Sequence, residues 1–193
     1  MDLRLSSFAA LTVLSIPCMG AISDAQSLIA AWPEHSRVLA EEIVQEYGTP
    51  DVVEPAQLSW TGRRPWISMV VYRAASASGR PSDLQQSVSY DVPVGRWRAL
   101  GAFDRGVEYD PVARELIARG GDESANILAL NLADEVIRGR RTAAEAAEFY
   151  DKTLSLSLSG KNSPYMRKLR FRPQNLPERF PSDGIAVRKS LPG

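Results

Sequence analysis

Two tryptophans bracket a pair of arginines in the stretch WTGRRPW, residues 60–66. A guanidinium group can stack on an aromatic ring or form paired hydrogen bonds with a carboxylate or a phosphate, and Trp beside Arg is a frequent composition of hot spots in protein contacts. Trp97 repeats this composition, because it lies between Arg96 and Arg98. The sequence therefore predicts a binding surface. Its predicted residues are Trp60, Arg63, Arg64, Trp66 and Trp97.

The tryptophans of this stretch have an alternative role in packing. Trp60 and Trp66 are six residues apart around a turn, so both can face the same side of a hairpin and cover the end of a preceding helix near Tyr47. The two arginines lie at the turn itself, where charged side chains are seldom buried. Packing of the tryptophans and exposure of the arginines are therefore compatible.

Three carboxylates occur close together in the stretch FDRGVEYD, at Asp104, Glu108 and Asp110. Carboxylate oxygens are ligands of calcium, although this spacing does not match the loop of an EF-hand. A pair of carboxylates is also the usual acid/base machinery of glycoside hydrolysis. The alternative function is thus a carboxylate-dependent hydrolase or a calcium-binding enzyme that acts on an envelope glycan.

Other catalytic chemistries lack the residues that they require. His35 is the only histidine, which excludes a histidine-rich metal site within one chain, and its place in the first turn of a predicted helix favours a surface or capping role. There is no glycine-rich phosphate loop followed by lysine. We therefore expect no metal and no cofactor, and a non-catalytic binding or scaffolding role is favoured over an enzyme.

The N-terminal residues have the order of a secretory signal peptide. Arg4 is followed by an apolar run over residues 8–16 and then by small residues. We predict cleavage after Ala25, with Ala21 or Ser23 as alternatives. The apolar run is far shorter than the roughly 20 residues that span a bilayer, so the mature chain is expected to have no transmembrane segment and to be periplasmic or secreted.

Cys18 offers a different processing route, because a cysteine at the end of a signal peptide can carry the lipid of a bacterial lipoprotein. Ile16 and Pro17 stand where such processing favours small residues, so the context disfavours this alternative. Removal of residues 1–25 would leave a chain without cysteine, and hence without a disulfide or a thiolate site.

The charges divide the chain into an acidic body and a basic tail. Residues 26–160 contain 14 basic and 19 acidic residues, whereas residues 161–193 contain eight basic and two acidic ones. The tail is rich in proline and shows no hydrophobic period, so we expect it to be extended or disordered. It suggests an anionic envelope component or an envelope protein as partner, whereas export and a net charge of +0 argue against nucleic acid.

Hydrophobic periodicity and capping residues predict the remaining elements. Strands grouped between helices indicate one α+β domain, residues 26–160, with a small antiparallel sheet packed against an N-terminal helix and two C-terminal helices. Asn126, Asn131 and Asp134 are polar residues of an otherwise apolar helix, and we expect them to find partners or to line a pocket. The predicted elements are a helix over 33–47, a hairpin over 57–73, a polar loop over 75–86, a strand over 87–93, one helical turn over 94–104, one or two strands around Asp110-Pro111, and helices that begin at Asp122 and Thr142.

In a set of short motifs between residues 32 and 150, the chain resembles a group of uncharacterised bacterial exported proteins. The resemblance implies export but no established activity. The chain lacks the histidines of that group in the loop after the hairpin, so a role of those histidines does not carry over. The motifs are Trp32-Pro33, Tyr47-Gly48, Trp60, Pro65-Trp66 and the run Leu128 to Ala133.

Overall fold

The computed structural model describes residues 25–73 and 83–174. An antiparallel sheet has six strands in the order β1-β2-β3-β4-β6-β5, and the predicted α+β fold is confirmed. The strands are β1 (Val52–Glu54), β2 (Gln57–Thr61), β3 (Ser68–Tyr72), β4 (Leu84–Ser89), β5 (Val107–Asp110) and β6 (Glu115–Gly120). The helices are α2 (Glu34–Tyr47), α3 (Trp97–Phe103), α4 (Glu123–Ile137) and α5 (Ala143–Leu158), with short 3-10 helices η1 (Val94–Arg96) and η2 (Pro164–Met166).

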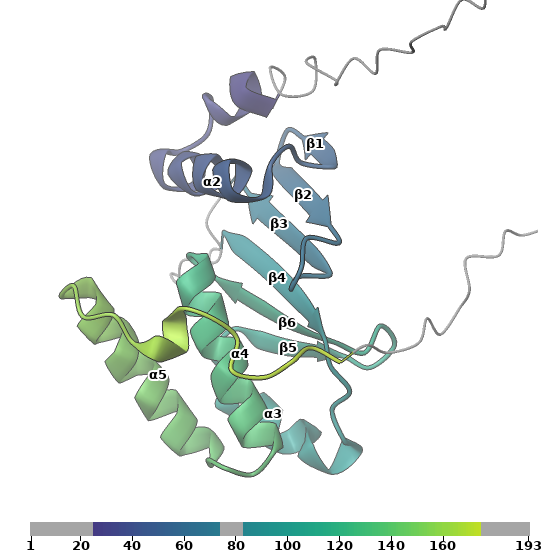
Figure 1. Ribbon diagram of the computed structural model, residues 1–193, viewed down its shortest axis with the longest axis vertical. Helices are drawn as coiled ribbons and strands as arrows, with labels where there is room; N and C mark the ends of the chain where they lie inside the picture. The colour runs from purple at the N-terminus through teal and green to yellow at the C-terminus, as the bar shows by residue number, and fades with distance from the viewer. Residues whose placement is uncertain (1–24, 74–82, 175–193) are drawn as a thin grey trace, which may run out of the picture.

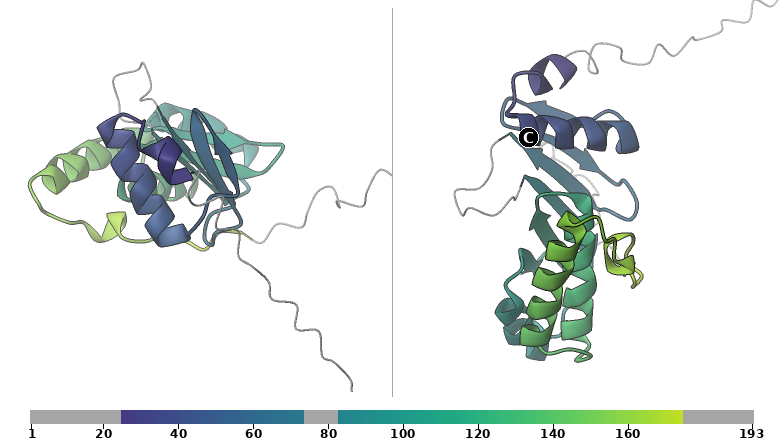
Figure 2. Two further views of the ribbon diagram at one scale, coloured as in Figure 1. Left: turned by 90° about the horizontal axis from the view of Figure 1, so that it is seen from above. Right: turned by 90° about the vertical axis from the view of Figure 1, so that its left-hand side faces the viewer.

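The helices cover one face of the sheet. α2 contacts β3, while α4 contacts β4, β5 and β6, and Figures 1 and 2 show α2 at one end of the sheet and α4 and α5 at the other. Alternate residues of each strand point to this covered face. Met69, for example, lies between Trp60 on one neighbouring strand and Gln86 on the other, and all three are fully buried.

Capping residues set the start of both C-terminal helices, as the sequence predicts. Asp122 accepts a hydrogen bond from the backbone of Ala125 at 2.7 Å. Thr142 and Glu145 form a complete capping box at the start of α5, which satisfies backbone donors that the first turn leaves open. Twelve residues of α4 are buried, because α3, α5, η2 and the sheet surround it.

Two predicted elements differ from the structure. β4 begins at Leu84, inside the predicted polar loop, and ends before Tyr90. The sequence does not indicate the start of this strand, because Gln85 and Gln86 are both polar and therefore lack the alternation of polar and apolar residues that is typical of a strand. The predicted single helical turn after residue 93 is a longer helix, α3, which buries Leu100 and Phe103.

The domain extends beyond its predicted end at residue 160. Met166 and Phe171 belong to the hydrophobic core, and the ring of Phe171 meets that of Tyr90 edge-on at 5.5 Å. The backbone of Gln174 donates to the carbonyl oxygen of Ser89 at 2.9 Å. Residues 161–174 are therefore part of the folded domain. The rest of the predicted tail and nearly all of the predicted signal peptide lie outside the described residues.

Within the described residues, none of the helices has the length and the apolar composition that crossing a bilayer would require.

Candidate functional site

Trp60 and Trp66 are core residues. Their exposed fractions are 0% and 2%. The indole of Trp60 donates to the carbonyl oxygen of Gly48 at 2.9 Å, and that of Trp66 donates to the hydroxyl of Tyr47 at 3.1 Å. Because the end of α2 covers both rings, the prediction that they form a contact surface is wrong, and the packing alternative holds.

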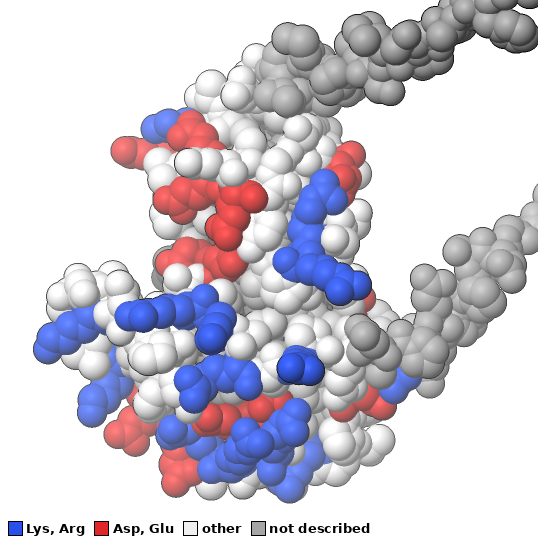
Figure 3. Space-filling view, viewed as in Figure 1, with Lys and Arg blue, Asp and Glu red and all other residues white. Residues whose placement is uncertain are grey.

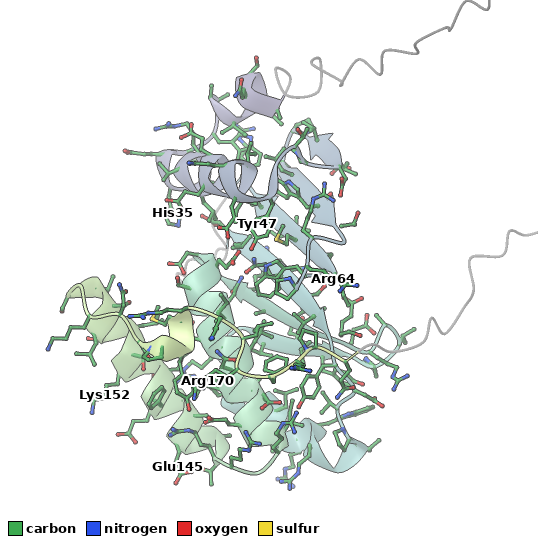
Figure 4. All side chains as sticks on the ribbon, viewed as in Figure 1. His35, Tyr47, Arg64, Glu145, Lys152 and Arg170 are labelled. Carbon is green, nitrogen blue, oxygen red and sulfur yellow. The ribbon has the colours of Figure 1, made fainter. Side chains whose placement is uncertain are left out.

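Arg63 is tied into the fold, whereas Arg64 is exposed. The guanidinium of Arg63 donates to Asp51 at 2.7 Å, to the carbonyl oxygen of Thr61 at 2.8 Å and to that of Tyr47 at 3.4 Å. It thereby joins the β2–β3 turn to the C-terminal end of α2. The backbone N–H of Thr61 and, secondarily, Arg63 hold the pKa of Asp51 below its ordinary value. Arg64 projects from this turn (Figure 4).

Trp97 belongs to a different cluster. Its side chain is 42% exposed, donates to the carbonyl oxygen of Val92 at 2.9 Å and lies 5.8 Å from the ring of Tyr109. These neighbours come from the connection between β4 and α3 and from β5, not from the β2–β3 turn that carries Arg64. The structure therefore does not assemble the five predicted residues into one surface.

The three carboxylates of the alternative site lie at the end of α3, in β5 and at the start of the β5–β6 turn. Asp104 ends α3 with a left-handed backbone, at a φ of 39°. Asp110 caps the β5–β6 turn, since its Oδ1 accepts from the backbone of Val112 at 2.7 Å and of Ala113 at 2.9 Å. Glu108 is an exposed residue of β5. In the described parts of the chain, no group of three or more His, Cys, Asp or Glu side chains is placed to hold a metal ion.

His35 is exposed on α2 (Figure 4), and its Nε2 lies 3.6 Å from a carboxylate oxygen of the buried Asp83. No described residue donates a hydrogen bond to the oxygens of Asp83.

A chain of polar side chains fills the space between the end of α2 and the start of α4. Glu123 accepts from the hydroxyl of Tyr47 at 2.9 Å and from the amide of Gln86 at 2.8 Å. The oxygen of Gln86 in turn accepts from Asn126 at 3.0 Å. Burial raises the pKa of the Glu123 carboxyl, and the two donors only partly offset this effect.

Replacement of Glu123 by glutamine is expected to change the pH dependence of stability. With a folded pKa above the unfolded one, Glu123 binds its proton more tightly in the native state, so the wild type loses stability as the pH rises through that interval. The variant lacks this loss. The difference in unfolding free energy, variant minus wild type, should therefore increase in urea titrations as the pH rises above the ordinary pKa of glutamate, about 4.3. Glu42→Gln, at an exposed position of α2, is the control, and a constant or falling difference would contradict the expectation.

Two hollows lie at the other end of the helical layer. The tail hollow, of about 500 Å³, is lined by Asn131, Asp134, Glu135, Arg140 and residues 168–172. The turn hollow, of about 380 Å³, is lined by Arg96, Ala99, Val136, residues 139–143 and Glu145. Both are open to solvent, and Arg140 lines both of them.

The carboxylates of the tail hollow are engaged by neighbouring side chains. Asp134 accepts from the hydroxyl of Tyr90 and from the guanidinium of Arg138, each at 2.7 Å. Glu135 accepts from the hydroxyl of Tyr165 at 2.7 Å. Glu135 also pairs with Arg141, so each of the two carboxylates forms its ion pair with an arginine other than Arg140, Arg170 and Arg172.

The cations of the tail hollow, by contrast, have few partners. Arg140, Lys168 and Arg172 are exposed and form no ion pair with any residue in the ranges 25–73 and 83–174. The guanidinium of Arg170 lies over the ring of Tyr165, 4.4 Å from its centre. The arrangement suits an anionic group, because several uncompensated cations converge on one concave surface.

Asn131 holds the segment that brings three of these cations to α4. The residue is buried, with an exposed fraction of 2%. Its side-chain amide donates to the carbonyl oxygens of Tyr165 at 2.9 Å and Lys168 at 3.0 Å. Its oxygen accepts from the backbone of Arg170 at 2.7 Å. Asn131 thus has the partners that the sequence led us to expect.

The basic residues form a visible cluster on the molecular surface. Figure 3 shows Lys and Arg gathered mainly over the part with α4, α5 and the segment after α5, and Asp and Glu gathered over α2. Arg170 is labelled in Figure 4 on the segment that passes in front of α4. The charge pattern of the sequence predicts a basic tail but not the convergence of its first residues with the RGRRT turn, residues 138–142.

No protein-family model, curated protein or solved structure matches this chain. The resemblance to exported bacterial proteins stays a prediction.

Proposed function

We propose that this protein is a non-catalytic binding module of the bacterial cell envelope and that it takes an anionic envelope component at the tail hollow. The observation that carries this proposal is the excess of cations there. Arg140, Lys168 and Arg172 have no ion-pair partner among the described residues, while Asp134 and Glu135 are engaged elsewhere. The predicted signal peptide supports a periplasmic or secreted location.

The chemistry of the hollow favours a phosphate or carboxylate group over a neutral ligand. Arginine offers paired donors with a geometry that matches both anions, and a concave basic surface raises the local concentration of anions. Single exposed charges contribute little, so the proposal depends on the cluster. Binding should weaken as salt is added, because these cations are exposed to solvent.

The test is co-sedimentation of the processed, full-length chain with vesicles of phosphatidylglycerol and phosphatidylcholine in equal parts. Each Lys or Arg beside an anionic membrane surface contributes about 1 kcal/mol, so the double variant Arg140→Gln/Lys168→Gln should bind about 30-fold more weakly. Vesicles of phosphatidylcholine alone should not bind.

The matched control is Arg64→Gln/Arg98→Gln, which removes two exposed arginines outside the tail hollow. It should keep nearly all of the binding. Equal losses in the two double variants would contradict a site at the hollow, and binding of neutral vesicles would contradict an anionic ligand. A loss confined to the control variant would return the site to the surface around Arg64 and Trp97.

A further inference from the structure

The turn hollow resembles the tail hollow in its balance of charges. Among the described residues, Glu145 is the only carboxylate that lines it, and this carboxylate accepts from the backbone of Thr142 at 2.8 Å and from its hydroxyl at 2.9 Å. Arg96 and Arg140 form no ion pair with a described residue. The turn hollow therefore also presents uncompensated positive charge.

Arg96 is brought to this place by a close approach to Gly139. The glycine has a φ of +70°, and a Cβ atom on it would lie 3.0 Å from Nη2 of Arg96. A larger residue would therefore push the guanidinium away from the α4–α5 turn. The absence of a side chain at position 139 lets an arginine from before α3 lie directly on the turn that carries Arg140.

Arg141, the third arginine of the turn hollow, is already engaged. Its guanidinium donates to Glu135 and lies over the ring of Phe149, 4.6 Å from its centre. It therefore lines the hollow, but its guanidinium is already held by these two contacts. The cations available to a ligand are Arg96 on one side and Arg140 at the boundary with the tail hollow.

We propose that the ligand carries two linked phosphate-type groups, one bound in the turn hollow by Arg96 and Arg140 and the other bound in the tail hollow by Arg140, Lys168 and Arg172. This inference rests on the proposed function, since it requires the tail hollow to bind an anion. Arg140 lines both hollows, so two anionic groups can be held on either side of one guanidinium.

Linkage of two such groups has a measurable consequence. Once the first group is bound, the second binds at a high effective concentration, which can strengthen binding by about 100-fold or more without any new contact. A single phosphate can occupy only one hollow at a time. A ligand with two phosphates should therefore bind far more tightly than the sum of two independent phosphates.

Two pairs of probes test this with the processed, full-length chain. In solution, pyrophosphate, which has two linked phosphates, is compared with orthophosphate by calorimetry. On vesicles of phosphatidylcholine, diphosphoryl lipid A is compared with monophosphoryl lipid A. In at least one pair, we expect the two-phosphate probe to bind about 100-fold more tightly per phosphate than the single-phosphate probe. A gain in the first pair identifies a soluble ligand, and a gain in the second pair identifies a membrane-bound one.

Arg96→Gln should abolish this gain, because it removes one of the two cations of the turn hollow, whereas the single-phosphate probe should still bind in the tail hollow. Arg98→Gln, an exposed arginine of α3 that lines neither hollow, should retain the gain. Equal affinity per phosphate in both pairs, or a gain that survives Arg96→Gln, would overturn the two-group ligand and leave the proposed function standing. No binding of any of the four probes would overturn the two-group ligand, and no binding of the phosphatidylglycerol vesicles as well would overturn the proposed function.

Discussion

Trp60→Ala is expected to lower the free energy of unfolding by about 3–5 kcal/mol, the usual range for a large aromatic residue lost from a core. Trp60 is fully buried and lies opposite Met69 in the sheet, so alanine would leave a cavity beneath the end of α2. The carbonyl oxygen of Gly48 would also lose its indole donor. Urea unfolding monitored by circular dichroism measures this effect.

Trp97→Ala is the matched control, because it removes the same side chain from a site that is 42% exposed. Its loss of one hydrogen bond and of the contact with Tyr109 should cost about 1 kcal/mol. Losses of equal size at Trp60 and Trp97 would contradict the assignment of Trp60 to the core. The comparison also distinguishes a packing role from a surface role for two tryptophans that both lie close to arginines in the sequence.

Asn131→Ala is expected to lower the free energy of unfolding by about 2–4 kcal/mol, because it leaves three backbone groups without a partner. These groups are the carbonyl oxygens of Tyr165 and Lys168 and the N–H of Arg170. The segment after α5 should then separate from α4. Urea unfolding gives the cost, and limited digestion with trypsin should show faster cleavage at Lys168 and Arg170.

Asn162→Ala is the control for this variant, since Asn162 is exposed on the same connection. It should change neither stability nor the rate of cleavage. Wild-type protection from trypsin in Asn131→Ala would contradict the role of Asn131 in holding the segment. Detachment should also weaken the binding of anionic vesicles, since Lys168 would leave the tail hollow.

The elements that the sequence predicts well are those whose signals are local. The helix that ends at Gly48, the cap at Asp122 and the capping box of Thr142 and Glu145 each depend on residues a few positions apart. The order of the segment after α5 depends instead on Asn131, more than 30 positions earlier in the chain. Such a contact leaves no periodic pattern in a stretch of arginines and prolines.

The candidate site was harder to predict, because composition does not reveal burial. Arg63 and Arg64 are neighbours in the sequence, but only Arg63 reaches the carbonyl oxygens beside the end of α2, those of Tyr47 and Thr49. The cations of the two hollows come from the residue before α3, the α4–α5 turn and the segment after α5. Their convergence depends on how these three parts pack, and the charge of the tail alone could not reveal it.

The strand order also has a consequence for how the chain can fold. Every neighbouring pair in the sheet is consecutive along the chain except β4 and β6, so most pairings close short loops at a small entropic cost. The pairing of β4 with β6 must instead bring together segments separated by α3 and β5, and contacts between distant segments slow folding. The sheet therefore has a single non-local seam, where the four consecutive strands β1 to β4 meet the β5–β6 hairpin, and the hairpin depends on that seam because two strands alone are only marginally stable.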